Sequence, residues 1–300
     1  MNASKLIFLF CVLEFSATVF SSAYSQEKAQ PDFVSILRQT GPYNPDEKQT
    51  YPDFTYQSSS DPHLVELRTA FNLDSVAGTG SQVDRAIRLM HWMHDAVPHD
   101  DNKPLKELNA LNIITTYKKS KYAQACYGLS ISLNEIFLSM GFKSRVVICF
   151  SHNYEHTNGG HVITALFIDS LNKWIYTDAQ ENAYVKDEKG NLLSIEEVRQ
   201  RLIDGRPMIL NPAANYHNIP STKKEYLYTF MAEHIYRFIC PLNSEYNSQT
   251  REPGKIMQYV ELLPVNSGEP PIDKFESQDK NDFHVVSYHT NNDLLFWKKP

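Results

Sequence analysis

The sequence has little cysteine and glycine, and positive charge is not in excess. Four cysteines in 300 residues are too few for a disulfide scaffold, and they do not form the CxxC pairs of a zinc ribbon. The formal net charge of −6 provides no broad basic surface, so nucleic acid is not expected as a partner. A hydrophobic content of 42% is enough for a sizeable core and excludes wholesale disorder.

Long apolar runs are lacking beyond the N-terminus. Residues 1–25 combine the basic Lys5, a short apolar stretch at 6–13 followed by Glu14, and a small-x-small ending. This pattern is typical of a signal peptide that is cleaved after residue 25, and the stretch is short for the alternative, a membrane anchor. We therefore expect an exported protein, periplasmic or secreted, with no stable membrane span after cleavage.

The rest of the chain divides into an irregular lead-in at 26–62, rich in Pro, Gln, Ser and Tyr, and one domain at 63–300. Helical spacing of apolar residues and capping signals predict helices at 63–73, 83–97, 123–140, 194–205 and 224–239. β-Branched and aromatic residues predict strands at 144–150, 161–169, 173–179, 259–265 and 283–290. The order predicts an α+β fold in which N-terminal helices pack on an antiparallel sheet.

Three residues in the middle of the chain could form a nucleophilic site. Cys126 lies at the start of a predicted helix, where the partial positive charge and free N–H groups favour a thiolate and an adjacent oxyanion. His161 opens one predicted strand and Asp178 lies on the next. Cysteine, histidine and aspartate in this arrangement would be nucleophile, proton carrier and orienting acid of acyl transfer. Alone, Cys126 would more simply be a buried core residue, and the two partners favour the nucleophile.

The stretches ACYGLSISLNEIFLSMGFKSRVV, HVITALFID and WIYTDA resemble the transglutaminase-like superfamily, over about residues 83–205. The resemblance implies a papain-like α+β core, with Cys126 as nucleophile, His161 as base and Asp178 as orienting acid. Members of that family include transpeptidases that crosslink Gln to Lys, cysteine peptidases and peptide-glycan amidases. The helix that contains Trp92 is similar to the family's helix before the catalytic one, so Trp92 is a candidate for substrate contact.

Two features depart from a simple version of this site. Gln124, two residues before the cysteine, could donate to an oxyanion, or it could be a polar cap at the helix start. A two-residue hairpin loop would pair Asp178 with Ala165, about 13 Å along the strand from His161. A bulge or strand twist would then have to close the gap.

The remaining cysteines and histidines have simpler interpretations. Cys149 and Cys240 are expected in the core, or paired with each other in an oxidising compartment. Two histidine groups suit packing or solvation better than metal binding, because no HExxH pattern accompanies them; these are His91, His94 and His99, and His152, His156 and His161. No metal or other cofactor is expected. A run of aromatic residues at 226–238 could line a groove or pack in the core.

The sequence thus predicts an exported thiol enzyme that cleaves or transfers amide acyl groups through a Cys126 thioester. Its partner would be a peptide or protein substrate, including cell-envelope material. The alternative is a non-catalytic module that retains the fold and binds a peptide or glycan.

Overall fold

The computed structural model describes residues 32–153, 159–267, 274–278 and 284–300. The predicted signal peptide and His156 lie outside these ranges, so their predictions stay untested. Among the described residues, no helix is both long and apolar enough to cross a bilayer.

The helices differ from the predicted set in their ends and in three additional α-helices, at 33–39, 110–120 and 293–296. Those described are α1 (Phe33–Gln39), α2 (Pro62–Ala70), α3 (Leu73–Ala77), α4 (Gln82–Ala96), α5 (Ala110–Ser120), α6 (Cys126–Ser139), the 3₁₀ turn η2 (Asp169–Leu171), α7 (Ile195–Asp204), the π-helix η3 (Lys224–Met231), α8 (Ala232–His234) and α9 (Asp293–Phe296). The predicted helix at 63–73 is two helices, because Asn72 takes a left-handed conformation between α2 and α3. The capping boxes at Ser81 and Ser194 start α4 and α7.

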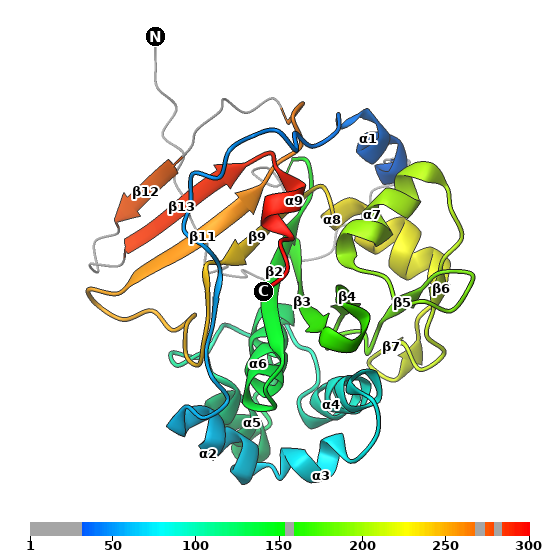
Figure 1. Ribbon diagram of the computed structural model, residues 1–300. Coiled ribbons are helices and arrows are strands. Elements are labelled where there is room, and N and C mark those ends of the chain that lie inside the picture. The colour runs from blue at the N-terminus through cyan, green and yellow to red at the C-terminus, as the bar shows by residue number, and fades with distance from the viewer. Residues whose placement is uncertain (1–31, 154–158, 268–273, 279–283) are drawn as a thin grey trace, which may run out of the picture.

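Seven of the described strands form one sheet, in the order β12-β13-β11-β9-β2-β3-β4 (Figure 1). They are β2 (Lys143–Phe150), β3 (Gly160–Ile168), β4 (Lys173–Thr177), β9 (Arg237–Pro241), β11 (Ile256–Leu262), β12 (Lys274–Gln278) and β13 (His284–Thr290). Short two-stranded pairs are formed by β1 (Thr55–Tyr56) with β10 (Asn243–Ser244), β5 (Val185–Lys186) with β6 (Ile209–Leu210), and β7 (Asn215–Tyr216) with β8 (Ile219–Pro220).

The α+β class is confirmed, but the prediction of a purely antiparallel sheet is wrong. β13 lies between β11 and β12, antiparallel to β12 and parallel to β11, so the sheet is mixed. The predicted helix at 224–239 is also too long. It ends at His234, and Arg237–Pro241 becomes β9 near the centre of the sheet, where all five residues are buried between β2 and β11.

The sheet separates two hydrophobic cores. Alternate residues of β2 point to opposite sides, so that Val146 and Ile148 join the core under α6, while Val147 and Cys149 join the other. Figure 1 shows α2 to α6 gathered on one side of the molecule and α1, α7 and α8 on the other. Because helices cover both faces of the sheet, the sequences of β2 and β3 are nearly continuous apolar runs without polar alternation.

Residues 32–62, the described part of the lead-in, form more regular structure than their composition predicts. They form α1, and β1 pairs in parallel with β10 from the distant residues Asn243 and Ser244. Tyr51 and Leu37 are buried in the same core as β4 and η3. The described residues of the lead-in, 32–62, therefore pair and pack with elements that follow residue 63.

Candidate active site

Cys126 is the first residue of α6, as the sequence predicts. Its N-cap is Ala125, which has no side chain that could accept from the first-turn N–H groups. The thiol is half-buried and free, and it lines a cavity of about 510 Å³. The positive end of a buried helix dipole therefore lies directly at the thiol.

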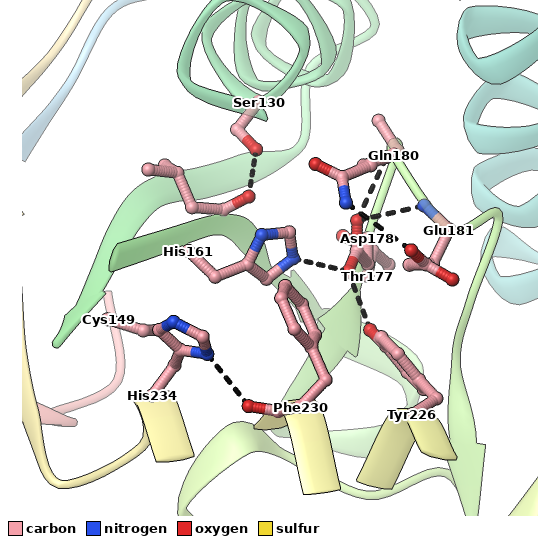
Figure 2. Close-up of polar contacts among 12 residues, drawn as sticks. Ser130, Cys149, His161, Thr177, Asp178, Gln180, Glu181, Tyr226, Phe230 and His234 are labelled. Atoms are coloured by element: carbon pink, nitrogen blue, oxygen red, sulfur yellow. Dashed lines mark hydrogen bonds and ion pairs between the residues drawn. The ribbon is translucent and has the colours of Figure 1, made fainter. Parts of the chain in front are cut away.

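His161 is the second residue of β3 and is 1% exposed. Its Nε2 lies 2.7 Å from Oδ2 of Asp178, and both side chains are fully buried (Figure 2). Gly160 precedes it at a point where strands β2 and β3 approach closely. A Cβ at residue 160 would lie 2.8 Å from the Phe150 ring and 2.9 Å from the Cys149 carbonyl oxygen. Glycine is therefore required for the strand to bring His161 to this position.

The loop between β3 and β4 corrects the expected register. The chain turns through η2 and a left-handed Asn172, so that Ile168 pairs with Lys173 and Thr164 with Thr177. Continuing this register puts Asp178 opposite Ile163 rather than Ala165. The loop is four residues long instead of two, and it moves the carboxylate two residues closer to His161, or about 7 Å along the strand. No bulge is needed for the two side chains to meet.

Asp178 accepts four hydrogen bonds, which satisfy both of its carboxylate oxygens. Oδ2 accepts from His161 and, at 2.6 Å, from the hydroxyl of Tyr226. Oδ1 accepts from the backbone N–H groups of Gln180 at 2.9 Å and Glu181 at 3.2 Å. Figure 2 shows these donors converging on the carboxylate from three sides. A buried carboxylate with this many donors is held in its ionised form.

The pKa values of the pair shift in opposite directions. Burial would lower the pKa of His161, but the charge and hydrogen bond of Asp178, together with the hydrogen bond and charge of Cys126, raise it to about 10. Burial would raise the pKa of Asp178, but the charge and hydrogen bond of His161 and the hydroxyl of Tyr226 lower it. His161 is therefore a cation at neutral pH, between an anionic carboxylate and the thiol.

The imidazole is bonded to Asp178 and lines the same cavity as Cys126. Asp178 occupies Nε2, so Nδ1 is the ring nitrogen that remains available to Cys126. Figure 2 shows this second nitrogen turned toward the helix that carries Ser130, which is α6. Of the three residues that the sequence singled out, Cys126 and His161 thus line one cavity, and Asp178 is bonded to His161. A thiol, an imidazolium and a carboxylate in this order can generate a thiolate and later return a proton to a leaving group.

The π-helix η3 supplies two contacts that the sequence did not predict. Tyr226 donates to Asp178 and also bonds the Tyr176 hydroxyl. Phe230, one turn further on, packs its ring against His161 in a T-shaped contact with centroids 4.9 Å apart. π-Helices are rare and often occur at functional sites. Their i→i+5 hydrogen bonding is not predicted by the helical spacing of apolar residues. The aromatic run at 226–238 therefore both lines a cavity and packs in the core: Tyr226 and Phe230 line the cavity, and Phe238 packs in the core.

Gln124 and Trp92, the two further candidates, are not among the described residues that line the cavity. Gln124 is 1% exposed, and its Nε2 donates to the backbone oxygen of the neighbouring Ala123. Its Oε1 lies against Gly128, where a Cβ would approach it to 2.9 Å. Trp92 packs against Phe71 with ring centroids 5.7 Å apart. Neither side chain is among the described residues that line the cavity, so the structure gives both a packing environment.

Cys149 and Cys240 are buried and free, so the alternative of a disulfide between them is wrong. Burial raises the pKa of the Cys240 thiol to about 12, which makes it inert. His91 and His94 bond to Asn182 and to the Ala179 carbonyl oxygen, respectively. Across the described ranges, no three His, Cys, Asp or Glu side chains are grouped to hold a metal ion.

Comparisons with known proteins identify no family for the chain. No family model and no curated protein matches it. Among solved structures, it is similar to a protein from Cytophaga hutchinsonii described as a "putative cysteine protease", with a TM-score of 0.33 and 12% identity. The match covers 53% of this chain and 59% of the length of that one.

Proposed function

We propose that this protein is a cysteine-dependent acyl-transfer enzyme that cleaves amide bonds of peptides or cell-envelope material, with a transglutaminase-like arrangement of its site. One observation carries the proposal. Cys126 lies at the start of α6, His161 is fixed by Asp178, and the cysteine and histidine both open on one cavity.

The reaction would proceed through a thioester. The Cys126 thiolate attacks the acyl carbon, and the carbonyl π electrons move to its oxygen, where N–H groups of the first turn of α6 can bind the oxyanion. The intermediate collapses, the C–N bond breaks, and His161 gives its proton to the leaving amine. A water then attacks the thioester, His161 takes a proton from it, and the acid and the thiolate are released. Asp178 stabilises the imidazolium throughout.

The test compares Cys126→Ala with the unaltered protein on a panel of peptides and peptidoglycan fragments. The substitution removes the nucleophile and should abolish turnover, whereas Cys240→Ala, which removes a buried thiol, should retain it. Turnover that survives Cys126→Ala would remove this mechanism. Peptide or glycan binding without turnover by the unaltered protein would instead favour the non-catalytic module.

Adding a primary amine to the assay distinguishes hydrolysis from acyl transfer to an amine. A primary amine present during turnover is incorporated into the product by a transferase and ignored by a hydrolase, which mass spectrometry of the product resolves. Export is a separate part of the proposal. Cell fractionation, with N-terminal sequencing to find residue 26 at the new terminus, tests it.

A further inference from the structure

The cavity at the thiol is lined by carboxylates. Asp101, Glu181 and Glu225 line it, and among the described residues that line it there is no lysine or arginine. No described lysine or arginine forms an ion pair with any of the three. The negative charge around the cavity is therefore not neutralised by side chains of opposite charge in the described part of the chain.

Glu181 is the most informative of the three because it is only 7% exposed. Its Oε2 accepts from the Ser221 hydroxyl at 2.7 Å, and its Oε1 lies at a long 3.3 Å from the Gln180 amide. These are neutral donors. A carboxylate withdrawn from water without a cation is costly, and a charged ligand of opposite sign would offset that cost.

The two histidines that line the cavity do not supply a positive charge to pair with Glu181. Burial lowers the pKa of His99, despite the opposing effect of Asp101, so His99 is neutral at neutral pH. His161 is a cation, but Asp178 holds it directly at 2.7 Å. Burial and the charge of Asp178 raise the pKa of Glu181, which is the direction expected for a carboxylate that lacks a close cation.

The remaining walls suit the stem of a long cationic side chain. Ile219 and Pro220 are aliphatic, and the rings of Tyr216 and Phe230 face the same cavity. Alkyl chains that end in a charged group bury the methylenes on such surfaces and place the head near carboxylates or aromatic faces.

We propose that the substrate of this site is an amide that carries an ammonium or guanidinium group beside the scissile bond, received by Glu181 with Asp101 and Glu225 around it. This inference rests on the proposed function. It adds the charge class of the substrate, which neither the thiol nor its histidine determines. A cavity lined by side chains of one charge also concentrates a ligand of the opposite charge and raises the rate at which that ligand associates with the protein.

A direct test needs no knowledge of the substrate, because the Cys126 thiol can report the charge of what enters the cavity. Two methanethiosulfonates of similar size are used, one with a trimethylammonium group and one with a sulfonate group. In each case the Cys126 sulfur attacks the reagent's sulfenyl sulfur, the S–S bond to the sulfonyl group breaks, and methanesulfinate leaves. Labelling that remains in Cys126→Ala is subtracted, and N-acetylcysteine amide serves as the uncharged reference thiol.

The cationic reagent should react with Cys126 at least about tenfold faster than the anionic one, relative to the reference thiol, and the ratio should fall as salt is added. Glu181→Gln keeps an acceptor for Ser221 but removes the charge, so the ratio should drop several-fold. Glu66→Gln makes the same change at an exposed position of α2 and should leave the ratio unaltered.

Peptide turnover gives the second measurement. Matched amides with lysine, norleucine or glutamate on either side of the scissile bond should rank in that order by kcat/KM, with the difference mainly in KM. Thiol labelling without charge preference, or a ratio unchanged in Glu181→Gln, would overturn the cationic substrate while leaving the thiol mechanism intact. A Cys126 that reacts with neither reagent would overturn both.

Discussion

At the scale of single residues, Asp178 does more than orient a histidine. Its four hydrogen bonds come from a side chain on β3, a side chain on η3 and two N–H groups of its own loop. Neither oxygen has to be satisfied by water, so the carboxylate can stay charged at full burial. The charged form of His161 depends on this one group more than on any other.

Replacing Asp178 by asparagine keeps the shape and an acceptor for His161 but removes the charge. The pKa of His161 should then fall from its raised value near 10, and its charged form should become less populated at neutral pH. We expect kcat/KM to decrease about 10²- to 10⁴-fold, the range for loss of an orienting acid. The rate of Cys126 alkylation by iodoacetamide, measured from pH 5 to 10, should show its transitions displaced, and an unaltered profile would contradict this role.

Tyr226 contributes one of the hydrogen bonds to Asp178. Tyr226→Phe leaves the ring in place and removes that bond, together with the one to the Tyr176 hydroxyl, so the pKa of Asp178 should rise and the pH dependence of turnover should shift at its acid end. A hydrogen bond to a charged group contributes roughly 1.5–3 kcal/mol, and the free energy of unfolding should decrease by about that amount. Tyr228→Phe removes a hydroxyl from a half-buried ring on the same helix and is the matched control. If both variants behave alike, Tyr226 is a packing residue only.

At the scale of elements, the approach of β2 to β3 places the histidine. Gly160→Ala would drive a Cβ into the Phe150 ring and the backbone oxygen of Cys149, and the backbone cannot move aside as a flexible side chain would. We expect a loss of about 1–3 kcal/mol in the free energy of unfolding and a larger loss of activity, because His161 is displaced with the strand. Urea denaturation and turnover measure the two effects.

The neighbouring glycine provides the control for that substitution. A Cβ at Gly159 would lie 3.9 Å from the His234 ring, an ordinary contact, so Gly159→Ala should fold and react normally. Equal damage from both substitutions would show that this segment tolerates no added methyl group, and that the close approach at Gly160 has no special role.

Local signals predicted the parts of the site that local structure determines. Cys126 begins a helix because the apolar spacing of α6 starts there. His161 is the second residue of β3, at the start of a run of β-branched and aromatic residues. The contact between Tyr226 and Asp178 joins residues 48 apart through tertiary packing, and no periodicity encodes it. β9 was missed because Arg237–Pro241 is buried on both faces and lacks alternation. The Asp178 register was wrong because a four-residue loop takes the place of the tightest possible turn.

At the scale of the whole molecule, the site depends on segments from both ends of the described chain. Arg145 of β2 is 2% exposed and donates to the Tyr56 hydroxyl and to the Phe296 carbonyl oxygen, at 2.6 Å each. Its guanidinium also stacks on the Phe54 ring, 3.8 Å from the centroid. Arg145 thereby connects residues 54–56 and the C-terminal helix α9 to β2, the strand that pairs with β3.

On the opposite side of the sheet, Glu135 of α6 connects segments that are far apart in the sequence. Its carboxyl group is 1% exposed and accepts from the backbone N–H groups of Ala110, at the start of α5, and Asn247. Burial raises the pKa of Glu135 to about 8, although both N–H groups oppose the rise. The folded protein therefore holds a proton here that the unfolded chain, with a pKa near 4.5, releases.

This proton makes the stability of the molecule depend on pH. Between about pH 4.5 and 8 the folded state binds the extra proton, so the Glu135 contribution falls as pH rises, by at most about 1.4 kcal/mol per unit. Glu135→Gln cannot titrate and accepts through one oxygen only, so it should be less stable at pH 5, with a gap that narrows toward pH 8. Urea denaturation at half-unit steps measures the gap, with Glu107→Gln at an exposed position as control. A gap that is constant across this range would mean that Glu135 is ionised in the folded protein throughout.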